Sequence, residues 1–292
     1  MSSQPSVCAS VPVMPSRVSL LNTPTLLAED VRGHTRRGRS PENYSPDFQV
    51  CFPYLGLFVW EVGGDRVVAH ANQVLFVTGG ECYVLEQPAS TAYAELVITP
   101  DLPTLAELAR VRDEHVASHR LFRRRSCRAS FSLQRAVAEC VQRSSAEDAD
   151  PIAREEWILD LLRAALLHET PPAPPAASTH RLISRAKEYL EAHLSRSLLL
   201  ADVAKAVGAS PAYLTDVFRR VEGIPLHRYV IQLRLARALT ELPHTNDLTR
   251  LALALGFSSH SHFTSLFRCA FGITPSAFRE RAAARRPPSI QP

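Results

Sequence analysis

The apolar residues in the last third of the chain follow helical spacing, and the same arrangement occurs twice. In the first copy, one predicted helix buries Leu200, Val203, Ala204 and Val207, and the next buries Leu214, Val217 and Phe218. Between them, Gly208 permits the positive φ that ends a helix, Ser210 supplies an N-cap oxygen and Pro211 suits the first helical position. Such a unit is a helix-turn-helix, a motif that often places its second helix in a DNA major groove.

The second copy lies 48 residues further along, counted from Ala204 to Ala252. Its first helix buries Leu248, Leu251, Ala252 and Leu255, Gly256 ends it, Ser258 or Ser259 caps the next helix, and that helix buries Phe263, Leu266 and Phe267. Between the copies, Leu226–Glu241 contains no glycine or proline and is predicted to be one connecting helix. Sixteen helical residues span about 24 Å. The two second helices could therefore lie one DNA turn apart, roughly 34 Å.

Three short stretches of the second copy carry a family resemblance. They are Ala252–Phe257, His262–Arg268 and Phe271–Arg279. With the double motif, they make residues 179–281 resemble the DNA-binding domain of the AraC/XylS family of bacterial transcription regulators. The resemblance covers about a third of the chain and implies an all-α domain of seven or so helices that binds promoter DNA.

The outward faces of the two second helices supply the candidate DNA contacts. Hydroxyls, imidazole and a small methyl group can all contact base edges, and the base-reading candidates are Ala212, Thr215, Asp216, His260, Ser261, Thr264 and Ser265. Guanidinium groups bind phosphate, and the phosphate candidates are Arg219, Arg220, Arg228, Arg234, Arg237 and Arg268. For each single arginine, a solvated surface charge is nearly as good an interpretation.

Two residues depart from the family pattern. Asp216 places a carboxylate on the first reading face, where it would oppose phosphate unless it accepts from a cytosine amine. Arg250 stands where the family often has an acidic residue. Neither departure affects the predicted fold, but Asp216 weakens the expected first half-site contact.

Residues 46–168 form the second predicted domain, which begins with strands. Short apolar runs lie at Phe48–Val62, Arg66–His70, Gln73–Val77, Tyr83–Glu86 and Ala94–Thr99, separated by glycine turns. This spacing predicts an antiparallel β-barrel or jelly roll. The family resemblance implies the same: a cupin-like barrel that binds a small effector, in a chain of α+β multidomain class. Aromatic residues are candidates for its effector pocket, although a plain core is the simpler interpretation: Tyr54, Phe58, Trp60 and Tyr83.

A cupin can also be a metal-dependent enzyme, which is the alternative function. His70 and Glu81 are the candidate ligands, but their spacing does not cluster them on adjacent strands, so we expect no metal, no cofactor and no catalytic residue. Cys51 and Cys82 could form a thiol sensor if they are close in space. The six cysteines form no CxxC motif. We expect them to be free, unreactive thiols in a reducing compartment.

Three amphipathic helices are predicted over residues 103–168, the clearest at Ile152–His168. They could form a homodimer interface, as the resemblance implies, or pack on the barrel of the same chain. Residues 169–178 are proline-rich and predict a semi-rigid linker. Residues 1–45 are predicted to be a disordered leader and residues 282–292 a disordered tail.

Charge divides the chain in the same place. Residues 1–177 carry a net charge of −4 and residues 178–292 carry +8, which gives +4 overall. The basic half is the half with the repeat, as a phosphate-facing surface requires. No apolar run is long enough to span a membrane and no secretory signal is evident, so we expect a cytoplasmic protein.

These patterns together predict a one-component transcription regulator, more often an activator among relatives. Its partners would be double-stranded promoter DNA, RNA polymerase if it activates, an unidentified small effector and a second copy of the chain. A third possibility is a DNA-binding protein whose barrel serves only for dimerisation.

Overall fold

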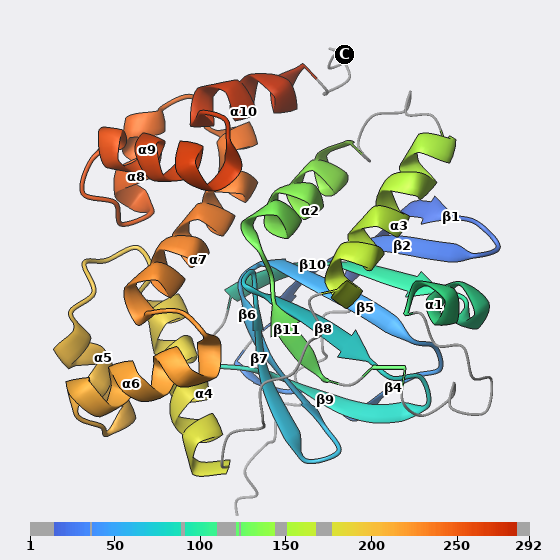
Figure 1. The fold of residues 1–292 in the computed structure, drawn as a ribbon, viewed down its shortest axis with the longest axis horizontal. Coiled ribbons are helices and arrows are strands. Elements are labelled where there is room, and N and C mark those ends of the chain that lie inside the picture. The colour runs from blue at the N-terminus through green and yellow to red at the C-terminus, as the bar shows by residue number, and fades with distance from the viewer. Residues whose placement is uncertain are drawn as a thin grey trace, which may run out of the picture.

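The computed structural model describes residues 15–35, 37–88, 91–109, 121–122, 124–143, 151–167 and 177–284. A β-rich N-terminal domain packs beside a helical C-terminal domain, and the long helix α7 (Leu226–Glu241) runs along the boundary between them (Figure 1). No helix in the described part of the chain is both long and apolar enough to cross a membrane.

The N-terminal domain contains two antiparallel sheets. The first has the order β1 (Ser16–Asn22), β2 (Leu26–Thr35), β10 (Thr91–Pro100), β5 (Gln49–Leu55), β8 (Gln73–Val77) and β11 (Ser126–Arg128). The second has the order β3 (Gly38–Arg39), β9 (Glu81–Gln87), β6 (Leu57–Val62) and β7 (Asp65–His70), with β4 (Asn43–Ser45) also paired to β9. Among the described residues no strand pair joins the two sheets, so the predicted barrel is instead a pair of facing sheets.

Alternation along the strands gives the six-stranded sheet two apolar faces. The inner face packs against the five-stranded sheet around Trp60 and Phe58. The outer face packs under α1 (Leu102–Leu108), α2 (Phe131–Arg143) and α3 (Pro151–Leu167). The apolar side of α3 contributes Ile158, Leu161, Leu162 and Ala165 to that core. These helices were predicted either to form a dimer interface or to pack within the chain. The apolar side of α3 is buried by packing within the chain.

The predicted leader is wrong for residues 15–45. Four strands occupy this stretch, and β2 pairs with both β1 and β10 inside the six-stranded sheet. Leu26 and Ala28 of β2 are fully buried. Their alternation with polar residues is a strand pattern, but the many Ser, Pro and Arg residues nearby made the stretch resemble a disordered segment. Residues 1–14 lie outside the described residues.

Seven α-helices make up the described C-terminal domain: α4 (Ala177–Ala192), α5 (Leu200–Val207), α6 (Pro211–Glu222), α7, α8 (Leu248–Ala254), α9 (His260–Phe271) and α10 (Pro275–Ala283). A 3₁₀ turn, η1 (Leu242–His244), follows α7. The predicted linker falls outside the described residues except for residues 177–178, which begin α4. Of the predicted tail, residues 282–284 lie at the end of α10 and the rest is outside the described part.

Capping residues delimit both helix-turn-helix units as predicted. Gly208 takes a left-handed conformation after α5, with φ of 72°. The hydroxyl of Ser210 accepts from the backbone N–H of Tyr213 at the start of α6, and that of Ser259 accepts from His262 at the start of α9.

Two apolar cores lie at opposite ends of α7. Its first half packs through Tyr229 and Leu233 into the first unit, which is built from α4, α5 and α6. Its second half packs through Leu235 and Leu239 into the second unit, which is built from α8, α9 and α10. The connecting helix is therefore shared by both cores.

Candidate DNA-binding surface and interdomain pocket

The exposed faces of α6 and α9 match each other position by position. The two helices are of equal length and start 49 residues apart, at Pro211 and His260. Their buried sides hold Leu214 with Phe218 and Phe263 with Phe267. Opposite these lie two exposed triads in equivalent positions: Ala212, Asp216 and Arg219 on α6, and Ser261, Ser265 and Arg268 on α9.

The other base-reading candidates are less exposed. Thr215 is half-buried and its hydroxyl donates to the backbone carbonyl of Ala212 at 2.9 Å. Thr264 is half-buried as well, and its hydroxyl lies 3.4 Å from the Nε2 atom of His260. These residues flank the exposed face, and each hydroxyl already has a local hydrogen-bond partner.

Asp216 has a local partner for its charge. Its carboxylate pairs with Arg220, one turn further along α6, and both side chains are about two-thirds exposed. The ion pair offsets the repulsion that the carboxylate would otherwise have with phosphate. Surface ion pairs of this kind are weak, so the Asp216–Arg220 pair can break when DNA binds.

The arginines predicted to bind phosphate differ in how far they are already engaged. Arg219, Arg228 and Arg268 are exposed. Arg237 pairs with Glu241 at 2.9 Å. Arg234 is partly buried and donates to the carbonyls of Leu194 and Arg196, so it joins α7 to the end of α4.

Two exposed residues at the starts of the reading helices were not among the predicted contacts. Tyr213 is 52% exposed in the first turn of α6. His262 is exposed in the first turn of α9, with its Nδ1 atom 3.1 Å from the Ser258 hydroxyl. Recognition helices contact bases with their N-terminal residues, and that general rule could have identified both.

The four aromatic residues predicted to line an effector pocket occupy two different places. Phe58 and Trp60 are buried between the sheets, and half-buried Tyr83 packs edge-on against Trp60. Tyr54 instead faces the outer side of the six-stranded sheet, beside α2 and α7. The structure therefore separates Tyr54 from the other three.

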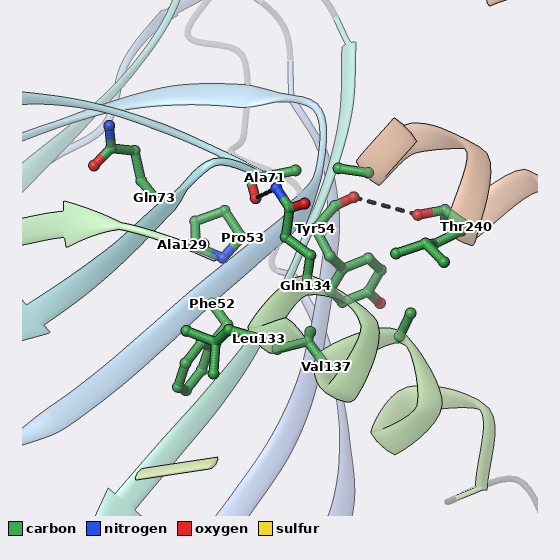
Figure 2. A pocket seen from close by; sticks show the side chains of 13 residues that line it. Phe52, Pro53, Tyr54, Ala71, Gln73, Ala129, Leu133, Gln134, Val137 and Thr240 are labelled. Atoms are coloured by element: carbon green, nitrogen blue, oxygen red, sulfur yellow. Dashed lines mark hydrogen bonds between the residues drawn. The ribbon is translucent and has the colours of Figure 1, made fainter. Parts of the chain in front are cut away.

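Figure 2 shows a small cavity where this outer face meets α2 and α7. Its volume is about 20 Å³, which is room for a single water molecule and too little for an effector. Gln134 donates to the carbonyl of Ala71 on one side, and the Thr240 hydroxyl donates to the carbonyl of Tyr54 on the other.

A much larger pocket lies next to it. Its volume is about 590 Å³, within the range of small-molecule sites. The ends of β2 and β10 form one wall, α2 another, and the end of α7 with η1 and α10 the third. Residues of both domains therefore line one cavity.

The polar side chains of the large pocket comprise one permanent cation, two histidines and neutral groups such as Gln142 that both donate and accept. Arg32, His34 and His244 line it, and none of the described residues in its lining is an aspartate or glutamate. Buried Asp30 lies behind this wall, where it accepts from Arg32 Nε at 2.9 Å and from the Tyr54 hydroxyl. Although desolvation opposes the charge, Tyr54 and Asp30 raise the pKa of Arg32, and 58% of its side chain stays exposed.

The candidate metal ligands have other partners. His70 is buried, accepts from the backbone N–H of Asn72 through Nδ1 and contacts the Tyr229 hydroxyl through Nε2. Glu81 accepts a bidentate pair of hydrogen bonds from Arg125. No cluster of metal-binding side chains occurs in the described ranges.

The proposed thiol pair is not formed. Cys51 is buried on β5, whereas Cys82 is exposed on β9, and both are free. Burial raises the pKa of the Cys51 thiol well above its usual value. A buried, protonated thiol is a poor sensor.

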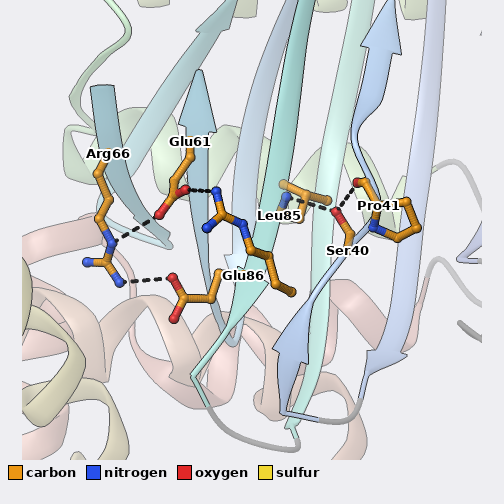
Figure 3. A network of polar contacts seen from close by, with 7 residues as sticks. Ser40, Pro41, Glu61, Arg66, Leu85 and Glu86 are labelled. Atoms are coloured by element: carbon orange, nitrogen blue, oxygen red, sulfur yellow. Dashed lines mark hydrogen bonds and ion pairs between the residues drawn. The ribbon is translucent and has the colours of Figure 1, made fainter. Parts of the chain in front are cut away.

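Ion pairs extend from the outer surface of the five-stranded sheet to the C-terminal domain. Arg66 lies between Glu61 and Glu86 (Figure 3). Its Nη1 atom also pairs with Glu188 of α4 at 2.8 Å. This surface cluster on the sheet thereby contacts α4, the helix that packs against the first helix-turn-helix.

Two matched helix-turn-helix units with opposed exposed and buried faces define a DNA-binding protein of the double helix-turn-helix class. A family model described as "Helix-turn-helix domain" matches residues 203–281. The regulatory protein SoxS of Salmonella typhimurium is 35% identical over 105 residues, which are 36% of this chain and 98% of SoxS. The chain belongs to the AraC/XylS family of transcription regulators.

Other relatives match different shares of the chain. PocR of Salmonella typhimurium is 36% identical over 110 residues, and the matched part covers 37% of this chain but only 36% of PocR. The activator RhaS of Escherichia fergusonii is 22% identical over 251 residues, covering 84% of this chain and 89% of RhaS. A fatty-acid-bound structure of ToxT from Vibrio cholerae covers 88% of this chain and 96% of ToxT, with 10% identity and a TM-score of 0.35.

Proposed function

We propose that this protein is a sequence-specific transcription regulator, and an activator, whose two reading helices enter successive major grooves of promoter DNA. The matched exposed triads of α6 and α9 are the observation that supports this proposal most directly. Each triad contains an arginine that can bind phosphate and two small or polar side chains that can face bases. As an activator it would also contact RNA polymerase, in the cytoplasm.

Binding of the full chain to the DNA upstream of its own gene, compared with a scrambled duplex, tests the proposal. The measurement is fluorescence anisotropy over a salt series. We expect the native duplex to be preferred at moderate salt, because base contacts persist when phosphate contacts weaken. Equal binding that disappears with salt for the native duplex and for a pool of random duplexes would overturn the proposal.

We further propose that the 590 Å³ pocket is where the protein senses its effector. Arg32 is a permanent cation, the histidines can donate hydrogen bonds, and the part of the lining that the structure describes has no aspartate or glutamate. The walls between these groups are apolar, including Leu239 and Val141. A small organic anion with an apolar body fits this lining, and it would touch both domains at once.

A thermal-shift series with 4-phenylbutyrate and 4-phenylbutanol, which differ at the charged group, tests this pocket. We expect the acid alone to stabilise the protein, and we expect Arg32→Ala to abolish that shift. Arg163→Ala, which removes an exposed arginine of α3 that pairs with Asp160, is the matched control. An equal response to both compounds would refute recognition of an anion.

The N-terminal domain would then be a sensor of cupin-like type and the protein a homodimer. Its two facing sheets have the antiparallel arrangement that this proposal requires. Analytical ultracentrifugation of the full chain tests the dimer, and a single species at the monomer mass throughout the micromolar range would contradict it.

A further inference from the structure

A buried polar network joins the two domains at α7. Asn72, in the turn between β7 and β8, donates through Nδ2 to the carbonyl of Tyr229 at 3.2 Å. Gln232, one turn further along α7, donates to the carbonyl of Ala129 at 2.7 Å. Gln134 of α2 fixes Asn72 by donating to its side-chain oxygen at 2.8 Å. Because these groups are buried, the Asn72 and Gln232 hydrogen bonds each favour one position of α7.

The ring of His70, at the end of β7, adds a second hydrogen bond to Tyr229 of α7. Its Nδ1 atom accepts from the Asn72 backbone N–H, so in the neutral ring the Nε2 atom carries the hydrogen and donates to the Tyr229 hydroxyl. Burial, together with the charge of Lys187, lowers the pKa of His70 well below its usual value and keeps the ring neutral. The neutral form is the one that matches both partners.

The first helix-turn-helix receives a further contact from β8. Lys187 of α4 pairs with Glu222 at the end of α6, 2.8 Å away, and both side chains are buried. Gln73, in the amide orientation that satisfies its neighbours, accepts from the same Lys187 ammonium at 2.9 Å and donates to the Cys127 carbonyl at 3.0 Å. The N-terminal sheet thereby contacts the pair that joins α4 to the first reading helix.

The second helix-turn-helix is contacted by α2. Arg135 donates to the carbonyl of Phe271, the last residue of α9, at 2.7 Å. The ring of Phe131 packs edge-on against that of Phe271, with centroids 5.7 Å apart. This places a cation and an apolar group at the C-terminal end of the second reading helix, where helix carbonyls favour a positive charge.

We infer that the N-terminal domain sets the spacing between the two reading helices, and that Arg135 and Gln232 are positioning residues for operator recognition. The N-terminal domain contacts α4 near the end of α6, the middle of α7 and the end of α9. The two apolar cores pack on opposite halves of α7, so bending or twisting that helix moves one unit relative to the other. The inference rests on the proposed function, because spacing matters only when both helices read one duplex.

Apart from the Phe131–Phe271 ring contact, these contacts are directional hydrogen bonds and ion pairs, which favour one defined geometry. A buried amide that moves away from its acceptor loses its hydrogen bond and leaves a desolvated polar group unpaired, which opposes the displacement. The large pocket opens between the same elements, beside Thr240 and α2. A ligand bound there would change how firmly the N-terminal domain holds α7. It would thereby change the half-site spacing that the protein prefers.

The test measures affinity against half-site spacing. Operators are selected from random duplexes with the full-length protein, and 1, 2 or 3 base pairs are then inserted or removed between the two half-sites. Anisotropy gives Kd for each duplex with the wild type, with Arg135→Ala/Gln232→Ala and with Arg135→Ala alone. Arg135→Lys, which keeps a donor, tests rescue, and Arg163→Ala is the charge-matched control. Circular dichroism at 222 nm checks folding.

For the wild type we expect a shift of two base pairs to raise Kd about tenfold, which is about 1.4 kcal/mol. For the double variant we expect the penalty to fall to about twofold, with Kd for the optimal operator changed far less. The spacing penalty of Arg135→Ala should lie between those of the wild type and the double variant. The single variant therefore tests the inference if the double variant fails to fold.

An unchanged spacing profile in the folded variants, at any absolute affinity, would overturn the inference and leave the proposed function intact. Failure of the wild type to select any sequence would overturn the proposed function, and with it the inference. The two failures are therefore distinguishable.

Discussion

The buried Lys187–Glu222 pair gives a sharp prediction about the stability of the DNA-binding domain. The ammonium and carboxylate are 2.8 Å apart, and only 10% and 7% of the two side chains are exposed. Replacing Lys187 with Met leaves Glu222 as a buried charge without its cation. Breaking a buried pair in this way costs about 3–5 kcal/mol, because the remaining charge keeps its desolvation penalty.

The double variant Lys187→Met/Glu222→Met should recover most of that loss. Two apolar side chains of similar volume remove both the pair and the penalty, and such replacements are often neutral. We therefore expect each single variant to be much less stable than the double. With a urea dependence of about 2 kcal/mol/M, a loss of 3 kcal/mol lowers the unfolding midpoint by about 1.5 M.

The assay is urea unfolding of the full chain followed by circular dichroism at 222 nm, which reports mainly on the helices. Arg220→Met, which removes an exposed ion pair of α6, is the control and should change the midpoint by less than about 0.5 M. The reasoning is refuted if the double variant loses the sum of the two single losses, because additivity would mean that the charges do not stabilise each other.

Three further predictions follow from other parts of the molecule. Gly256→Ala should destabilise the protein by at least about 1 kcal/mol in thermal unfolding, because its φ is 84° and an added Cβ would lie 2.7 Å from the guanidinium of Arg234; an unchanged Tm would contradict this. Burial raises the pKa of Glu95 from 4.5 to about 7, so its neutral form is favoured in the fold, and stability present below pH 4.5 should be lost as pH rises towards 7. Glu95→Gln should flatten that part of the urea-midpoint profile, and a parallel profile would refute the assignment. Arg219→Ala and Arg268→Ala should each reduce the slope of log K against log salt by about 0.9, while Arg163→Ala leaves it unchanged; no change in slope would exclude those two phosphate contacts.

The C-terminal domain was largely predictable because its local signals agree with its packing. Gly208, Ser210 and Pro211 mark a turn by their backbone chemistry alone, and the spacing of Phe263 and Phe267 identifies the buried side of α9. Such signals lie within a few residues of the feature that they determine. Sequence therefore located both reading helices and their buried sides, but only part of their exposed faces.

The N-terminal domain was less predictable because its structure depends on distant pairing. The burial of Ala28 depends on β10, about 70 residues away, where Ile98 is its partner. Tyr54 and Trp60 are close in sequence, but Gly56, with φ of 71°, separates β5 from β6 and the two aromatic residues belong to different sheets. An aromatic-rich stretch could not show which ring faces which side.

The hydrogen bonds from side chains to distant backbone groups carried no sequence signal at all. Arg234 resembled the other arginines of α7, yet its carbonyl partners lie in the turn after α4. Asn72, Gln134 and Gln232 belong to residue types that are mostly exposed, and only the facing backbone explains their burial. Arg32 lies in a stretch that was predicted to be disordered, so its pocket could not be anticipated.

The central claim is that the exposed faces of α6 and α9 read two half-sites. The most direct test is selection from random duplexes with the wild type, repeated with Asp216→Ala on α6 and with Ser261→Ala/Ser265→Ala on α9. We predict two enriched half-sites with centres about 10 base pairs apart, and each variant should alter the preferred bases in a different half-site only. A single enriched site, or variants that leave both half-sites unchanged, would contradict the claim.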